Sequence, residues 1–75
     1  MTVQAAGLTI ISPNEVRAFA RVDGVSVRLE FEQHDGHWIE GPAFFKGPSD
    51  KYDRWTQARK AARHVFEQWQ DGEFQ

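Results

Sequence analysis

Residues 17–38 contain arginine and large aromatic side chains at a spacing suited to molecular recognition. Along residues 16–31, apolar residues alternate with arginine, phenylalanine, serine and glutamate, and alternating side chains lie on opposite faces of a strand. Arginine and aromatic residues are enriched where proteins bind partners, and arginine on a sheet can also read guanine edges in DNA. We therefore expect a binding surface formed by Arg17, Phe19, Arg21, Arg28 and Trp38.

Two other groups of residues suggest metal binding or acid–base catalysis, but each lacks a feature that such a site requires. His34-Asp35-Gly36-His37 brings two imidazoles and a carboxylate into one turn, but a tight turn splays its side chains and a structural zinc site needs four ligands. Glu30 and Glu40 could serve as paired carboxylates, but an open sheet face offers them no pocket. The sequence has no nucleophile elbow, phosphate-binding glycine loop or triad spacing. We expect no metal, no cofactor and no enzymatic activity.

A second basic group lies near the C-terminus. Arg59, Lys60 and Arg63 fall within about 100° of one another on a helical wheel, and Glu67, one turn beyond Arg63, partly neutralises Arg63. Most such stripes are solvated surface. We treat this one as a secondary candidate site, on the opposite side of the domain from the sheet surface above.

The elements that must position the first group are two strands joined by Asp23-Gly24. Asp-Gly favours a two-residue type I′ turn, in which both central residues have positive φ. The strands are expected over about 16–22 and 25–32. This register places eight apolar residues on one face, in the pairs Val22–Val25, Ala20–Val27, Ala18–Leu29 and Val16–Phe31.

The turn at His34-Asp35-Gly36 fixes the third strand, expected over about 37–41. A three-residue loop with Gly36 in the left-handed conformation would place Ile39 opposite Phe31 on the apolar face. It would send Trp38 outward and set Glu40 opposite Glu30. A two-residue loop would instead place Ile39 on the other face and set Glu40 opposite Phe31. We prefer the three-residue loop because it keeps the core face apolar, and a slip of one residue would reverse every side chain.

The start of the chain leaves an alternative open. Residues 8–11 are β-branched and apolar and could form an edge strand. Ser12 followed by Glu15 fits a helix-capping box, and Pro13 suits a first helical position, so residues 13–21 could instead be helical. We favour the hairpin, because a helix there would last barely two turns before Asp23-Gly24.

A long amphipathic helix is expected over about 50–70, capped by Ser49 or Asp50 and ended by Gly72. Its apolar residues recur at helical spacing: Tyr52, Trp55, Ala58, Ala62, Val65, Phe66 and Trp69. The sequence therefore predicts one small α+β domain spanning residues 1–75. Its fold is a three-stranded antiparallel β-meander, four-stranded if residues 8–11 join it, packed on one C-terminal amphipathic α-helix.

Composition favours a protein partner over nucleic acid. The 75 residues include 9 Lys and Arg against 11 Asp and Glu, for a net charge of −2, and no cysteine. Nucleic-acid modules usually carry a basic excess. No stretch approaches a membrane span and no signal peptide is evident, so we expect a cytoplasmic protein. These features suggest a small non-catalytic binding module, such as a phage or mobile-element inhibitor or adaptor of a host protein. Its oligomeric state stays open.

The order of elements over residues 15–70 resembles the plant-type AP2 domain and the arm-binding domains of tyrosine integrases. The residues that carry the resemblance are Arg17, Arg21, Arg28 and Trp38, with the alanine-rich run 58–62 of the helix. Those families back a three-stranded sheet with one helix and read the DNA major groove with the exposed sheet face. The resemblance therefore implies nucleic-acid binding as the alternative function.

Overall fold

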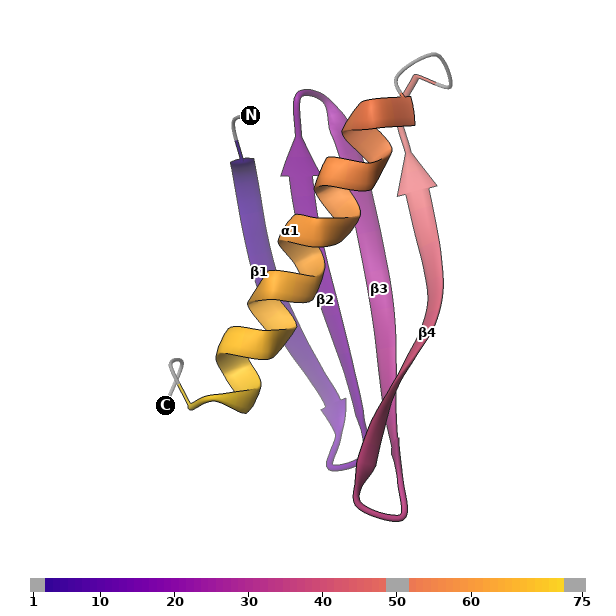
Figure 1. Ribbon diagram of the computed structural model, residues 1–75, viewed down its shortest axis with the longest axis vertical. Coiled ribbons are helices and arrows are strands. Elements are labelled where there is room, and N and C mark those ends of the chain that lie inside the picture. Colours follow the sequence, from indigo (N-terminus) through magenta and orange to yellow (C-terminus); the bar gives the residue numbers. More distant parts are fainter. Residues whose placement is uncertain (1–2, 49–51, 73–75) are drawn as a thin grey trace.

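The computed structural model describes residues 3–48 and 52–72, which form a two-layer α+β fold (Figure 1). Four strands form one antiparallel sheet in the order β1-β2-β3-β4, and the helix crosses one face of this sheet diagonally. The meander on one helix agrees with the expected fold class. The elements are β1 (Val3–Ser12), β2 (Glu15–Val22), β3 (Val25–His34), β4 (His37–Lys46) and α1 (Tyr52–Gln70).

The β2–β3 hairpin has the register expected from its sequence. Asp23 and Gly24 have φ angles of 50° and 83°, as a type I′ turn requires. Val22 lies opposite Val25, and the pairing continues without a shift to Val16 opposite Phe31. Residues 13–21 are therefore not helical, and the capping-box alternative is wrong.

The β3–β4 turn differs from the expected one. Asp35 and Gly36 have φ angles of 53° and 81°, so this Asp-Gly pair also forms a two-residue turn, with His34 opposite His37. The expected three-residue loop is wrong. Consequently Ile39 faces away from the helix and is 53% exposed, whereas Glu40, opposite Phe31, faces the helix.

A β-bulge in β4 restores the apolar pattern after Glu40. Phe31 pairs with Glu40 but Leu29 pairs with Ala43, so β4 has one extra residue at Gly41-Pro42. A Cβ on Gly41 would lie 3.0 Å from the carbonyl oxygen of Glu30, and proline is tolerated at bulges and on edge strands. The bulge turns Ala43 toward the helix and extends β4 to Lys46, beyond the expected end at residue 41.

Strand β1 is an edge strand, as residues 8–11 suggested, but it spans ten residues. It pairs only with β2, with Leu8 opposite Ala18 on the helix side. The chain turns into β2 at Pro13-Asn14, where the Asn14 amide donates a hydrogen bond to Ser12 Oγ (3.2 Å). A short hydroxyl side chain commonly stabilises a turn in this way.

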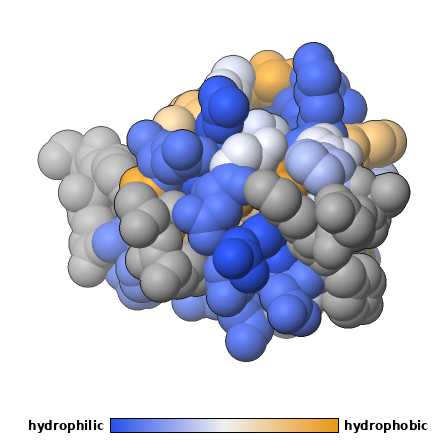
Figure 2. Space-filling model, turned by 90° about the horizontal axis from the view of Figure 1, so that it is seen from above, coloured by the Kyte–Doolittle hydropathy of each residue, from blue (hydrophilic) through white to orange (hydrophobic). Residues whose placement is uncertain are grey.

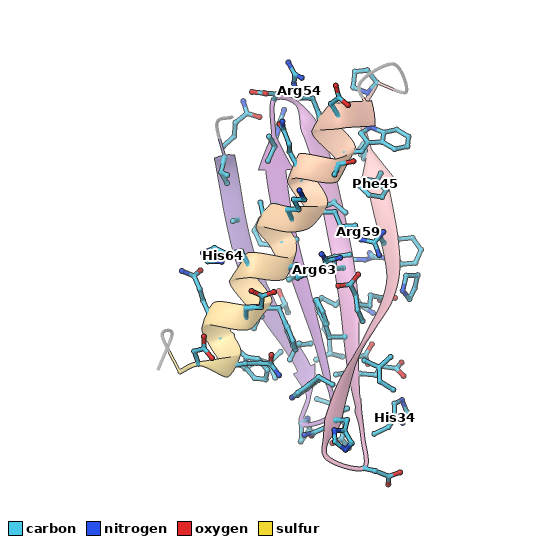
Figure 3. All side chains as sticks on the ribbon, in the orientation of Figure 1. His34, Phe45, Arg54, Arg59, Arg63 and His64 are labelled. Carbon is cyan, nitrogen blue, oxygen red and sulfur yellow. The ribbon has the colours of Figure 1, made fainter. Side chains whose placement is uncertain are left out.

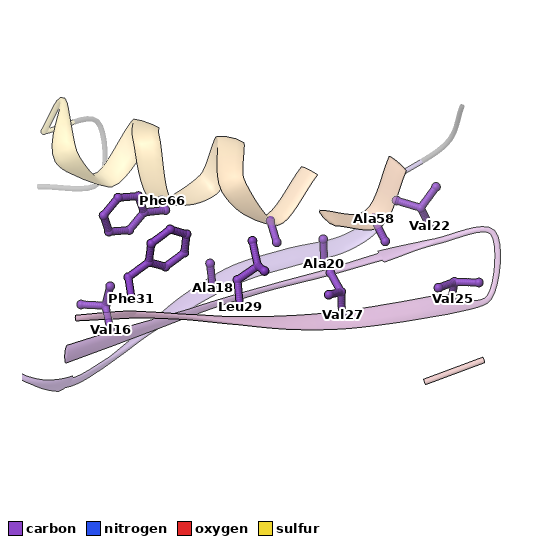
Figure 4. Close-up of a cluster of buried hydrophobic side chains, with 11 residues drawn as sticks. Val16, Ala18, Ala20, Val22, Val25, Val27, Leu29, Phe31, Ala58 and Phe66 are labelled. Carbon is purple, nitrogen blue, oxygen red and sulfur yellow. The ribbon is translucent and has the colours of Figure 1, made fainter. Parts of the chain in front are cut away.

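The core lies between the helix and the central strands (Figure 4). Phe66 of α1 stacks on Phe31 of β3, with ring centroids 3.8 Å apart and planes 3° apart. Helix termination at Gly72 is confirmed by its φ of 82° and by its amide, which donates to the Trp69 carbonyl (3.0 Å). The expected caps, Ser49 and Asp50, lie outside the described residues. The buried set is Val16, Ala18, Ala20, Val22, Val25, Val27, Leu29, Phe31, Ala58, Ala62, Val65 and Phe66.

Candidate binding face of the sheet

The sheet face opposite the helix, called here the outer face, carries four of the five expected binding residues. Arg17, Phe19, Arg21 and Arg28 project from β2 and β3 on this side, since their strand neighbours are buried against the helix. Trp38 does not join them. It lies on the helix side at edge-to-face distances from Phe66 (5.6 Å) and Trp69 (5.5 Å), because the two-residue turn reverses the expected register of β4.

One row of residues crosses all four strands of the outer face: Gly7, Phe19, Arg28 and Phe44. Phe19 and Phe44 are 44% and 47% exposed. The Arg28 guanidinium carbon lies 4.6 Å from the centre of the Phe44 ring, within cation–π range. Phe19 covers Gly7, where a Cβ would lie 2.6 Å from its ring. The row therefore presents a cation between two exposed aromatic rings.

Two more cations extend this row toward the Asp23-Gly24 turn. Arg21 and Lys46 pair across Ser26 in the adjacent row, and both are exposed. An open hollow of about 320 Å³ lies above Ser26 between the two phenylalanines. Viewed from the end of the molecule that carries this turn, most of the described residues that are visible are hydrophilic (Figure 2). We call this group the basic–aromatic patch: Phe19, Arg21, Ser26, Arg28, Phe44 and Lys46.

The carboxylates of the outer face gather at its other end. Arg17 Nε lies 3.0 Å from Glu30 Oε2, and Arg17 Nη2 lies 4.0 Å from Glu15. Glu32 pairs with Glu15 in the next row. Within the described part of the chain, no ion pair links Arg21, Arg28 or Lys46 to a carboxylate. Charge on this face is thus divided between an acidic end, where Glu15, Glu30 and Glu32 outnumber Arg17, and a basic end.

The second basic group is divided between the two sides of α1 (Figure 3). Arg59 Nη2 and Arg63 Nε each donate to the Glu40 carboxylate at 2.7 Å, and Arg63 Nη2 adds a bond of 3.1 Å. These two arginines are therefore engaged at the β4 edge of the core. Lys60 lies on the other side of the helix, together with His64 and above β1.

The Glu40 cluster should make stability depend on pH. Hydrogen bonds from Arg63, and then from Arg59, lower the pKa of Glu40 against the opposing effect of partial burial. A carboxylate with a lowered pKa in the folded state stabilises the fold above its unfolded pKa, about 4.3, and this contribution is lost as the pH falls through the folded-state pKa. We expect Glu40→Gln to reduce the free energy of unfolding at pH 7 by about 1–3 kcal/mol.

Urea melts from pH 7 to pH 3 test this expectation. The gap between wild type and Glu40→Gln should shrink progressively as the pH falls below the unfolded-state pKa of about 4.3 toward the lowered pKa of the folded state, because protons then bind first to the unfolded chain and afterwards to the folded protein. Glu32→Gln is the matched control, because Glu32 is exposed and 3.1 Å from His34 rather than beside an arginine. A Glu40→Gln gap that stays constant over this range would contradict the assignment.

We also looked for a metal site, a membrane-spanning helix and similar known proteins. Among residues 3–48 and 52–72, no three His, Cys, Asp or Glu side chains are grouped to hold a metal ion. Over the same residues, no helix is both long and apolar enough to cross a bilayer. Comparisons with protein-family models, curated proteins and solved structures find no match. The sheet also departs from the AP2 and integrase arrangement, because it has a fourth strand and Trp38 faces the helix.

Besides Ser26, which was not among the predicted site residues, sequence reasoning missed Phe44 and Lys46 of the basic–aromatic patch. Their place on the outer face depends on the bulge at Gly41-Pro42, because without the extra residue Phe44 would face the helix. The signal that could have revealed it was the pair Gly41-Pro42 inside a strand pattern, since isolated glycine and proline there often mark a bulge.

Proposed function

We propose that the protein is a small non-catalytic binding module whose basic–aromatic patch docks onto a segment of another protein. The observation that carries this proposal is the row Phe19–Arg28–Phe44, where two half-exposed aromatic rings flank a cation on the uncovered face of the sheet. Large aromatic and arginine side chains supply most of the energy at protein interfaces. The hollow between the rings offers an anchoring place for an apolar side chain.

The charges of the patch favour an acidic partner segment. Arg21, Arg28 and Lys46 have no carboxylate within ion-pair distance in the described residues. A carboxylate of a bound partner could therefore form an ion pair with them without displacing an existing one. A partner segment with an apolar side chain flanked by Asp or Glu matches both properties of the patch. Complementary charges also speed encounter and fix orientation.

Nucleic acid is the second candidate, and one observation favours it. Glu40 lies on the helix side, and the remaining outer-face carboxylates lie at the other end of the sheet from the basic–aromatic patch. Exposed aromatic rings beside arginine can stack on single-stranded bases. The net charge of −2 opposes this reading, because phosphate binding depends on a basic excess.

One experiment with two arms separates these classes. Random peptides displayed on phage are selected against the immobilised protein, and a labelled 20-nucleotide single strand and a 20-base-pair duplex are titrated in parallel. We expect selected peptides rich in Asp or Glu beside Phe, Trp or Leu, and no oligonucleotide binding at 200 mM salt.

The salt dependence of oligonucleotide affinity shows which result would contradict the protein-partner proposal. Three cations in contact with phosphates would weaken binding between 50 and 200 mM salt about 20-fold for a single strand and about 40-fold for a duplex. Oligonucleotide binding with such a slope, together with no enriched peptide motif, would exclude the protein-partner proposal and favour nucleic acid.

A further inference from the structure

Strand β1 leaves one edge of the sheet open, and its composition does not protect that edge. β1 pairs with β2 only, so alternate N–H and C=O groups along its other side are free of strand partners in the described structure. Edge strands are usually protected by charged residues, proline or short length. Val3–Ser12 is ten residues long and contains no charged residue and no proline. Its register against β2 shifts between Val3 and Ala5 and again between Ile10 and Ser12, and the stretch from Ala5 to Ile10 between these two points is regular.

The C-terminal half of α1 extends over and past this edge (Figure 1). Beneath it lies an apolar hollow of about 300 Å³ next to Ala6, with Ala61 and Val65 of the helix above. A second hollow of about 430 Å³ follows along the same edge beside Leu8 and Ile10, under Trp69. The helix thus forms a roof over the helix-side surface of β1.

The two hollows match the side-chain spacing of an extended strand. Ala6, Leu8 and Ile10 lie on the helix side of β1 at every second residue, and side chains of an added strand would follow the same period of two. Ile10 is 60% exposed, so an apolar side chain of an added strand could pack against it. Lys60 and His64 line the rim of the first hollow and Lys60 is exposed, which favours an acidic residue flanking the apolar ones.

From these features we infer that the β1 edge binds an extended peptide segment of a partner, with apolar side chains at alternate positions and a flanking carboxylate. The segment adds a fifth strand by main-chain hydrogen bonds, and its apolar side chains enter the hollows under α1. This mode of recognition uses the backbone for affinity and alternate pockets for specificity. It concerns a surface separate from the basic–aromatic patch.

A thin peptide fits this edge better than a second copy of the chain. Antiparallel β1–β1 pairing places the two-fold axis perpendicular to the sheet, so both helices would lie on the same side of the joined sheet. Each α1 already extends past its own β1 (Figure 1), so the two helices would meet over the junction. A single extended segment carries no such helix.

The test uses the peptide acetyl-Asp-Val-Thr-Val-Thr-Val-Asp-amide, titrated into labelled protein up to about 1 mM and followed by amide chemical shifts. Ala6→Lys places a long cation on the helix side of the exposed edge and should weaken binding at least about tenfold. Ala5→Lys is the matched control: it introduces the same charge at the neighbouring exposed position on the outer side. Its affinity should stay within about twofold of wild type. Circular dichroism melts confirm that both variants fold.

Two methylated peptides test the main-chain ladder. Alternate N–H groups of a strand point to the same side, and N-methylation removes the N–H donor. One peptide is N-methylated at both threonines and the other at all three valines. Only one of these two sets of N–H groups faces β1, so we expect one methylated peptide to bind and the other to fail. The inference is overturned if wild type does not bind the peptide, if both methylated versions bind, or if Ala6→Lys binds normally. It is also overturned if sedimentation shows a dimer of wild type that Ala6→Lys dissociates, since the occupant would then be a second copy.

Discussion

Replacing Phe66 with alanine is expected to lower the free energy of unfolding by about 3–5 kcal/mol, the usual cost of truncating a buried aromatic residue. Phe66 is 5% exposed and stacks directly on Phe31, and its ring also lies 5.6 Å from Trp38 and 5.8 Å from Trp69. Its removal therefore leaves a cavity at the centre of the aromatic cluster. A small domain has few other contacts to compensate.

Thermal and urea denaturation measure this effect, and the chain offers a control of the same residue type. For a domain of this size, each kcal/mol shifts the melting temperature by about 4–8 °C, so Phe66→Ala should melt at least about 12 °C below wild type. Phe44→Ala removes an equal side chain that is 47% exposed on the outer face and should cost less than about 1 kcal/mol. Equal losses for the two variants would contradict the assignment of the core to the helix side.

The second large effect is expected at Trp38. Truncation of a buried tryptophan costs about 3–5 kcal/mol, and because Trp38 is only partly buried against the helix, we expect Trp38→Ala to cost about 2–3 kcal/mol. Phe19→Ala should cost less than about 1 kcal/mol, the usual value of one cross-strand pair, since Phe19 only covers Gly7 on the outer face.

The comparison of Trp38 with Phe19 decides the register of β4. If Trp38 projected from the outer face, as Phe19 does, both truncations would be mild and similar. Urea melts of the two single variants therefore distinguish the two-residue turn at Asp35-Gly36 from the three-residue loop. A Trp38→Ala cost below about 1 kcal/mol would show that the helix-side placement is wrong.

Most of the fold follows from local sequence rules. Asp23-Gly24 determined its turn and, through it, the full β2–β3 register, because the type I′ turn and the alternating apolar pattern agree there. The period of apolar residues in α1 likewise predicted its buried face. These segments were predictable because two independent signals pointed to one structure.

The β3–β4 hairpin was predicted wrongly because its two signals disagree. The Asp35-Gly36 pair suits a two-residue turn, but that register places Glu40 on the apolar face, and the three-residue loop was preferred in order to avoid this. The carboxylate is tolerated there because Arg59 and Arg63 reach it from the helix. A partner nineteen or more residues away in sequence cannot be inferred from the strand alone. The bulge that turns Phe44 outward was missed for a different, local reason: Gly41-Pro42 was interpreted as the end of the strand and not as an irregularity within it.

The candidate site was predicted in part. Arg17, Phe19, Arg21 and Arg28 could be placed on one face by alternation alone. The division of that face into an acidic end and a basic end required the structure, because it depends on Arg17 lying 3.0 Å from Glu30 and on Lys46 lying across Ser26 from Arg21.

The central claim is that the basic–aromatic patch is the recognition surface, and one comparison tests it most directly. The affinity of a display-selected peptide is measured for Phe44→Ala and for Ile39→Ala, two truncations on the same strand and the same face. Ile39 is 53% exposed but lies at the acidic end of the sheet. We predict a loss of about 30-fold for Phe44→Ala, equivalent to a hot-spot effect of about 2 kcal/mol, and less than about threefold for Ile39→Ala. Equal affinities for the two variants, or a larger loss for Ile39→Ala, would contradict the claim.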